Sequence, residues 1–288
     1  MTEWKESEEV MDRLLPLVEK IPAFSQSVAR VLSLASDINC SAKDMVEVVS
    51  RDPVLTMKIL RLVNSAYFGR PSKVTSIHQA LVNIGLNTLK NTALSLALLG
   101  VLPRKSESGF DIDGLWLHCL AVGLASRRLA LATGHARSEA EEFFVAGLLH
   151  DMGKLIFAQY LPQEYAKALS SAASGKLPLH AAEELFLSVT HAQAGALLAQ
   201  RWKLSEALVL GLARHHTPEQ GEPSAMADVL FASNQVVKKL GLGSSGDFSS
   251  TTLPPGVRER LGLDPAGFKA AMEGLSEEMD SARAILSV

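Results

Sequence analysis

The stretch from 143 to 154 constrains the fold of this chain more than any other. Seven uncharged, mostly apolar residues, 143–149, run directly into His150 and Asp151. This run predicts a buried helix, and Gly153 is the expected signal that stops it. The helix end can present an imidazole and a carboxylate to one metal ion, and zinc, iron and manganese all accept such ligands. The structural alternative is that His150 caps this helix and Asp151 caps the next one.

Helical periodicity extends over nearly the whole chain, and strand signals are almost absent, so we predict an all-α fold. Punctuation by Pro, Gly and Ser separates the helices. Asp52 and Pro53 form a strong start signal, as N-cap and first helical residue. Asn64 is expected to close that helix in the left-handed conformation. The main helices are expected at 7–19, 25–35, 54–63, 75–84, 86–99, 114–131, 190–202, 205–214 and 224–240.

The stretch 100–114 is the expected boundary within the chain, because it holds Pro103 and two aspartates suited to capping. We predict an N-terminal helical part, 12–105, packed on a histidine-bearing helical part, 106–242. Residues 243–288 are predicted to form a C-terminal extension of two weaker helices. One joint core and two independent domains are both compatible with this pattern.

Bulk composition excludes several classes of protein. The 288 residues are 47% hydrophobic and 20% charged, which is typical of a globular protein. A net charge of -3 gives no electrostatic basis for binding nucleic acid or an anionic membrane. The N-terminus is polar and acidic, unlike a signal sequence, and no uncharged apolar run reaches the length of a membrane span, about 18 residues. Cys40 and Cys119 lack metal-type spacing, which favours reduced thiols and a cytoplasmic location.

Five histidines stand at helix starts, helix ends or apolar faces of the second half: His118, His150, His191, His215 and His216. One such residue is usually a hydrogen-bonded packing residue, but five together with Asp151 are harder to explain by packing alone. Buried imidazoles need partners, and a shared ion would satisfy several at once. The spacing is equally compatible with a common metal site and with a common polar site. His78, His135 and His180 lie in polar surroundings and are expected at the surface.

The order of these residues resembles the HD superfamily of metal-dependent phosphohydrolases, in particular the branch that includes cyclic-dinucleotide phosphodiesterases of the HD-GYP type. The segment His150-Asp151-Met152-Gly153-Lys154 and the pair His215-His216 carry this resemblance. The N-terminal motifs narrow it, because 51–56, 60–69 and 80–85 are similar to the HDOD domain. So are Trp116-Leu117-His118 and the segment 195–204. The resemblance covers residues 12 to 240.

This resemblance implies an all-α fold and two metal positions that share Asp151. His191, His215 and His216 would complete the first position, and His118 and His150 belong to the second. Asn234 stands where the superfamily pattern has a metal-binding Asp, and an amide oxygen is the weaker ligand. One site is therefore expected to hold iron, zinc or manganese more tightly than the other. Lys154 is expected to face the site and contact phosphate; the alternative is a solvated lysine at a helix start.

The resemblance also implies a role as an output or adaptor module in bacterial signalling, and we expect a non-catalytic module that binds an unidentified partner protein. No Gly-Tyr-Pro follows His216, which favours this non-catalytic function. The competing hypothesis is a metal-dependent phosphohydrolase or phosphodiesterase that acts on a nucleotide or cyclic dinucleotide. A third is a helical adaptor with a structural metal or an empty polar pocket. A monomer or weak dimer is expected in each case, with no nucleic acid or membrane partner.

Overall fold

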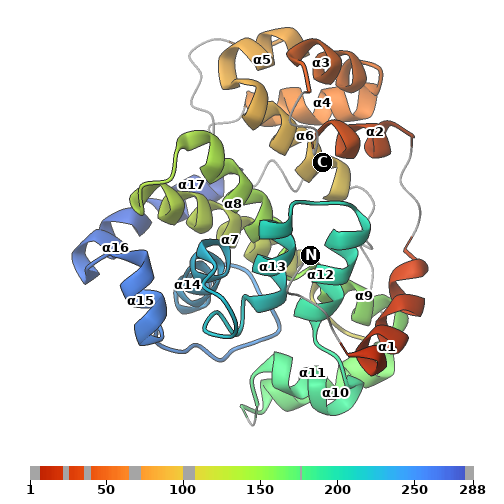
Figure 1. The fold of residues 1–288 in the computed structure, drawn as a ribbon, viewed down its shortest axis with the longest axis vertical. Coiled ribbons are helices and arrows are strands. Elements are labelled where there is room, and N and C mark those ends of the chain that lie inside the picture. Colours follow the sequence, from red (N-terminus) through yellow and green to blue (C-terminus); the bar gives the residue numbers. More distant parts are fainter. Residues whose placement is uncertain are drawn as a thin grey trace.

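The computed structural model describes residues 7–21, 26–35, 40–64, 73–99, 108–175 and 177–282. All regular elements in these ranges are helices, which confirms the all-α prediction (Figure 1). They are α1 (Glu8–Glu19), α2 (Gln26–Ala35), α3 (Ala42–Ser50), α4 (Pro53–Val63), α5 (Ile77–Ile84), α6 (Leu86–Leu99), α7 (Ile112–Ala132), α8 (Arg137–Leu149), α9 (Met152–Tyr160), α10 (Pro162–Ala173), α11 (Leu179–Leu187), α12 (His191–Arg201), α13 (Glu206–Arg214), α14 (Ala225–Leu240), α15 (Pro255–Leu261), α16 (Pro265–Met272) and α17 (Leu275–Ala282).

Helices α2 to α6 form a group of their own at the top of Figure 1. Side-chain caps begin these helices: Asp52, as predicted, accepts a bond from the backbone N–H of Leu55, and Ser76 caps α5. Apolar residues at helical spacing, such as Met45 and Ile59, are fully buried between the helices. Helix α6 also packs against α8, so the first group rests on the second half of the chain.

Asn64 ends α4, but its backbone is not left-handed as expected, because φ is -86°. Its side chain closes the turn instead. The amide Nδ2 donates to the carbonyls of Leu60 (2.8 Å) and Val74 (2.7 Å), and Oδ1 accepts from the N–H of Val74 (2.7 Å). Asn64 therefore joins the end of α4 to the chain that leads into α5. The rest of its motif, 65–69, lies outside the described residues.

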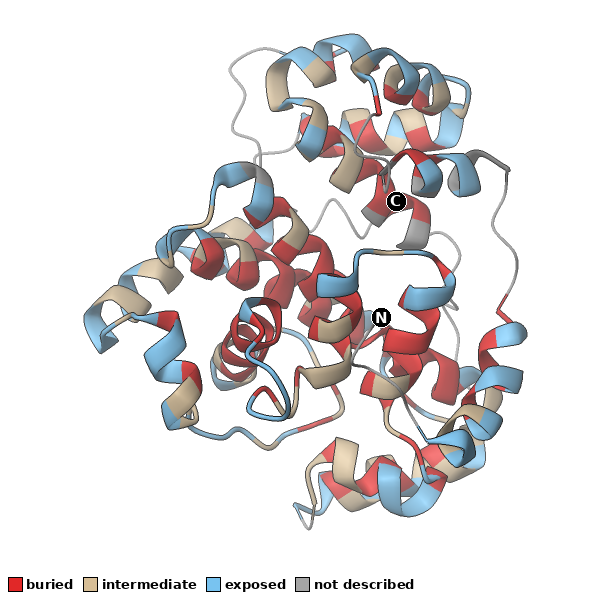
Figure 2. Ribbon diagram, viewed as in Figure 1, coloured by how far each residue is buried: buried red, intermediate tan, exposed pale blue. Residues whose placement is uncertain are grey.

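Helix α7 is the centre of the second half. It packs against α8 and α14, and Figure 2 shows buried residues concentrated in these central helices. By length and composition α7 could cross a membrane, although Arg127 and Arg128 interrupt its uncharged run, which is why the sequence indicated no span. The protein itself buries 72% of the apolar window of α7. Its apolar surface thus belongs to the core of this fold.

The predicted stop at Gly153 is wrong. Helix α8 ends at Leu149, and α9 begins at Met152, so Gly153 lies inside α9. Its role is close approach, because a Cβ at this position would lie 2.0 Å from the carbonyl oxygen of His191. The absence of a side chain lets the first turn of α9 touch the first turn of α12. This contact brings Asp151 next to His191.

The C-terminal extension is part of the core, and its described residues, 243–282, form three helices, α15 to α17, where two were predicted. Leu275 and Met279 are buried against α7. Arg127 and Arg128 are partly buried and both pair with Glu278 of α17. Part of the expected boundary at 100–114, residues 100–107, lies outside the described residues.

Candidate metal centre

His150 and Asp151 occupy the break between α8 and α9. His150 is the C-cap of α8, and its Nδ1 donates to the carbonyl oxygen of Gly147 at 2.7 Å. That bond turns Nε2 toward Asp151 Oδ2, 3.3 Å away. Asp151 stands at the N-cap of α9 but makes no capping bond with its side chain. His150 therefore does bond to the end of α8 through Nδ1, as the capping alternative expects. Asp151 does not cap α9 with its side chain, and its carboxylate faces histidines instead.

The first group of candidate ligands is Asp151, His191, His215 and His216, as expected from the resemblance. His191 is the first residue of α12, and Thr190 precedes it as N-cap in a capping box. His215 is the C-cap of α13, and His216 follows it. Asp151 Oδ1 lies 3.1 Å from His191 Nε2 and 3.6 Å from His215 Nε2. His191 Nε2 lies 3.3 Å from His215 Nε2 and 2.9 Å from His216 Nε2. Four potential ligand atoms thus surround one point.

The outer hydrogen bonds of these histidines direct their lone pairs to that point. His215 Nδ1 donates to the carbonyl of Leu212 at 2.7 Å, and His191 Nδ1 donates to Glu183 at 2.5 Å. Each imidazole in its neutral form then has an unprotonated Nε2 facing the others. Facing lone pairs repel unless a cation or a proton lies between them. Metal–ligand bonds of about 2.0–2.1 Å in a tetrahedron place ligand atoms roughly 3.3 Å apart, so the observed separations fit a transition-metal ion.

The second group is His118, His150 and Asp151. His118 comes from the middle of α7, and its Nε2 lies 3.7 Å from Asp151 Oδ2. Within the described structure, His118 Nε2 and His150 Nε2 have no hydrogen-bond partner although both are buried. The same holds for the amide oxygen of Asn234 on α14, which packs against α7. Unpartnered buried polar atoms are costly, so this side of the centre is also arranged for a positive group.

Lys154 faces the centre, as expected, and is not a solvated lysine. Only 1% of its surface is exposed. Its Nζ donates to Asp151 Oδ2 at 2.7 Å and to the backbone carbonyl of Ser245 at 2.9 Å. The ammonium is therefore held between the shared carboxylate and the segment that follows α14.

Electrostatics keep His118, His215 and Asp151 in the protonation states that metals require. Burial lowers the pKa of His118 well below its ordinary value and lowers that of His215 to about 3. Burial alone would raise the pKa of Asp151, but His150 and Lys154 outweigh it and hold that pKa well below the usual range. Neutral imidazoles at His118 and His215, beside an ionised carboxylate, are ready to bind a cation without first losing protons.

Two neighbouring residues were missed or misplaced by the sequence analysis. Glu183 is fully buried, and its Oε2 accepts both from His191 Nδ1 and from the backbone N–H of His191 at 2.9 Å. His180, expected at the surface, is half-buried and stacks on His216 with ring centroids 4.4 Å apart. Both belong to α11 and lie one turn apart. The signal in the sequence was the spacing of three residues between a histidine and a carboxylate in a predicted helix, which places both on one face. His78 is exposed, as expected.

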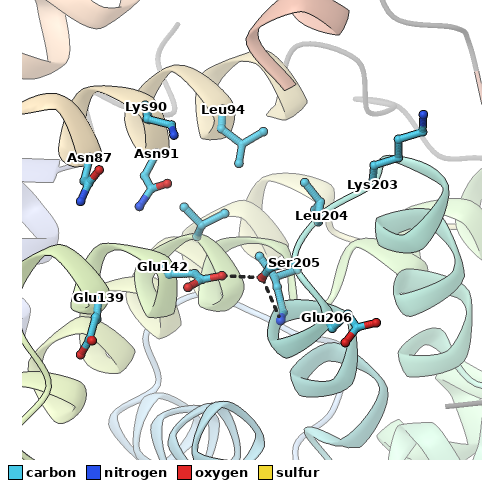
Figure 3. Close-up of a pocket in the computed structure, with 12 residues that line it drawn as sticks. Asn87, Lys90, Asn91, Leu94, Glu139, Glu142, Lys203, Leu204, Ser205 and Glu206 are labelled. Carbon is cyan, nitrogen blue, oxygen red and sulfur yellow. Dashed lines mark hydrogen bonds between the residues drawn. The ribbon is translucent and has the colours of Figure 1, made fainter. Parts of the chain in front are cut away.

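Two hollows lie near or between these elements. A pocket of about 400 Å³ beside His216 is lined by Thr217, Gln220 and Thr251, among others. A larger cleft of about 550 Å³ separates α6 from α8 and the start of α13 (Figure 3). There Asn87 and Asn91 face the hydrogen-bonded pair Glu142 and Ser205. None of the candidate ligands lines this cleft, so it is distinct from the metal centre.

Comparison with known proteins finds a matching family and solved structures of the same fold. The family model for the HDOD domain matches residues 21–218. An HDOD domain protein of unknown function from Geobacter sulfurreducens has the same fold, with a TM-score of 0.80 over 96% of this chain and 99% of that one, at 22% identity. A protein from Shewanella amazonensis SB2B, provisionally named a phosphohydrolase, gives a TM-score of 0.76 at 29% identity, over 95% and 98% of the two chains.

A curated relative is an uncharacterized protein of Treponema pallidum (strain Nichols), 29% identical over 219 residues. The match includes 75% of this chain but spans only 42% of the length of that relative. The family match extends over more than half of the present chain and includes all candidate ligands from His118 to His216. The chain therefore belongs to the HDOD family.

Proposed function

We propose that this chain is a signalling module of the HDOD type that holds one divalent transition-metal ion in a closed centre and acts on a partner protein without catalysis. The observation that carries the proposal is the convergence of Asp151 Oδ1 with the Nε2 atoms of His191, His215 and His216. Three of the four ligand residues are fully buried, as in a structural site. The chain would act in the cytoplasm as a monomer or weak dimer, without nucleic acid or membrane.

The bound ion would tie three separate parts of the chain together: the break between α8 and α9, the start of α12, and the end of α13. The ion would supply a positive charge, held by one carboxylate and three imidazoles. Because the ligands approach one another only in the folded chain, binding adds to folding stability. We infer that the ion fixes the surface that the module presents to its partner.

The surroundings of the centre favour binding over turnover. The transition state of phosphate-ester hydrolysis carries negative charge, which enzymes stabilise with cationic groups and metal ions. None of the described residues that line the pocket beside His216 is Lys or Arg, and Glu219 adds a carboxylate there. Lys154 is already engaged by Asp151 and Ser245.

The alternative function is a metal-dependent phosphohydrolase or phosphodiesterase acting on a nucleotide or cyclic dinucleotide. Two observations favour it: both ligand groups share Asp151, and a pocket of about 400 Å³ adjoins His216. Paired cation positions of this kind serve phosphoryl chemistry in other proteins.

Thermal melting and activity assays distinguish these functions. Chelator should lower the melting temperature of the metal-loaded wild type, because the ion binds only the folded state. His215→Ala should melt at the lower temperature and ignore chelator, whereas the exposed control His78→Ala should behave like the wild type. Phosphatase and phosphodiesterase assays with added manganese or iron should show no turnover. Identical melting with and without chelator contradicts the metal centre, and turnover that is lost in His150→Ala selects the alternative.

A further inference from the structure

We propose that the ammonium group of Lys154 takes the place of a second metal ion, so that the centre binds one ion per chain. The inference rests on the proposed function, since it presupposes an ion at the position formed by Asp151, His191, His215 and His216. It assigns Lys154 a role in setting metal stoichiometry in place of the phosphate contact that the resemblance implies.

The second position and the ammonium use the same oxygen. Asp151 Oδ2 faces His150 Nε2 at 3.3 Å and His118 Nε2 at 3.7 Å, and it accepts from Lys154 Nζ at 2.7 Å. Asp151 Oδ1 is the oxygen that faces the first position. One carboxylate thus divides its two oxygens between a metal position and a lysine. A second ion bound to Oδ2 would have to displace the ammonium or share the oxygen with it.

A segment that follows α14 holds the ammonium in place. We call residues 242–249 the strap. The strap lies on α7, where the N–H of Ser244 donates to the carbonyl of Gly114 at 2.8 Å. Gly243 has a φ of +76°, and a Cβ there would lie 2.2 Å from the backbone nitrogen of His118. From this position the carbonyl of Ser245 accepts from Lys154 at 2.9 Å.

The strap is also fastened at its far end. The buried carboxylate of Asp247 accepts from Lys238 of α14 at 2.6 Å. Two of the three donors of Lys154 are therefore committed, one to Asp151 and one to a carbonyl that is fixed by its own anchors. Lys154 cannot swing away from the second position without leaving the Ser245 carbonyl unpaired in the interior.

Charge balance leads to the same conclusion. In a centre with one ion, the two buried carboxylates, Asp151 and Glu183, would face one ammonium and one divalent ion. A second divalent ion beside the ammonium would add two positive charges and no compensating carboxylate, because residue 234 is Asn, whereas an ion in place of the ammonium would add only one. Uncompensated charge is strongly unfavourable in the interior. Lys154 and Asn234 are thus matched to a centre with a single ion.

Counting bound manganese tests the inference. We would measure equivalents of Mn²⁺ per chain by equilibrium dialysis for the wild type, Lys154→Met and Lys154→Gln. Gln keeps a donor for the Ser245 carbonyl and serves if Met prevents folding. Lys167→Met, at an exposed position of α10, is the matched control. The wild type and the control should bind about one equivalent, and the Lys154 variants about two, with circular dichroism unchanged.

The outcomes separate this inference from the proposed function. Two tight equivalents in the wild type contradict the inference and leave the metal centre intact. A folded Lys154 variant that still binds one equivalent does the same. A wild type that takes up no manganese and melts identically with chelator contradicts the proposed function, and the inference falls with it.

Discussion

At the scale of single residues, Glu183 determines how His191 meets the centre. Burial alone would lower the pKa of His191, but the carboxylate of Glu183 outweighs it and raises that pKa. A positive charge beside Glu183 is therefore favoured at this histidine. Carboxylates that hold a metal-ligating imidazole fix its tautomer and strengthen its basicity.

Glu183→Gln should weaken metal affinity by about 10-fold or more, because an amide cannot supply the negative charge behind His191. The measurement is a competition titration with a chelator of known affinity. Glu184→Gln, the exposed neighbour on α11, is the control. Equal affinities for both variants would show that the Glu183 bond is incidental to the centre.

Asn64 has a structural role of a similar kind in the first half. Its three side-chain hydrogen bonds join the end of α4 to Val74. Asn64→Ala should lower the free energy of unfolding by about 1–2 kcal/mol, in the range of lost caps and hydrogen bonds. Urea denaturation measures this directly, and unchanged stability with altered partner binding would make Asn64 a contact residue instead.

At the scale of elements, the crossing of α9 and α12 sets the distance between Asp151 and His191. Gly153→Ala should cost about 1–3 kcal/mol, because the new methyl group meets the His191 carbonyl. Gly195→Ala is a matched control on the facing helix, where a Cβ finds ordinary contacts no closer than 3.5 Å. That control should be neutral or slightly stabilising, since Ala favours helices. Equal losses in both variants would refute close approach as the reason for Gly153.

The strap predicts a particular dependence of stability on pH. Burial alone would raise the pKa of Asp247, but Lys238 outweighs it and lowers the pKa to about 2 from an ordinary 3.8. A depressed folded-state pKa stabilises the fold above the unfolded value, and that contribution is lost as pH falls through the folded value. The ionised group thus contributes about 2 kcal/mol above pH 4, at about 1.4 kcal/mol per pKa unit.

Asp247→Asn should therefore be less stable than the wild type at neutral pH, and the difference should shrink between pH 4 and pH 2. Asp12→Asn, at an exposed position of α1, controls for the change in net charge. Urea titrations across this range give the comparison. A difference that stays constant with pH would mean that the Asp247 charge does not anchor the strap.

At the scale of the whole molecule, local signals predicted the elements and the comparison of motifs predicted the centre. Asp52 begins its helix as expected, because a cap depends on residues within one turn. Gly153 was misinterpreted, because its reason is a contact with a helix that begins nearly forty residues later. Long-range pairing also explains why Glu183, Ser245 and the contact of Arg128 with Glu278 were not foreseen.

The extension shows the same limit. Its composition indicated two weak helices at the end of the chain, whereas Leu275 and Met279 complete the cover of α7. Helix propensity says little about which face will be buried and by what. The metal centre depends on this assembly, because the segment between α14 and α15 supplies the carbonyl that holds Lys154.

Anomalous scattering from crystals of the metal-loaded protein shows directly whether the centre holds one metal ion and where that ion lies. We expect a single strong peak, about 2.0–2.2 Å from Asp151 Oδ1 and from the Nε2 atoms of His191, His215 and His216. No comparable peak should lie beside His118 and His150, where Lys154 Nζ should remain on Asp151 Oδ2. The absence of any peak at the histidine cluster, or two equal peaks on either side of Asp151, would contradict this expectation.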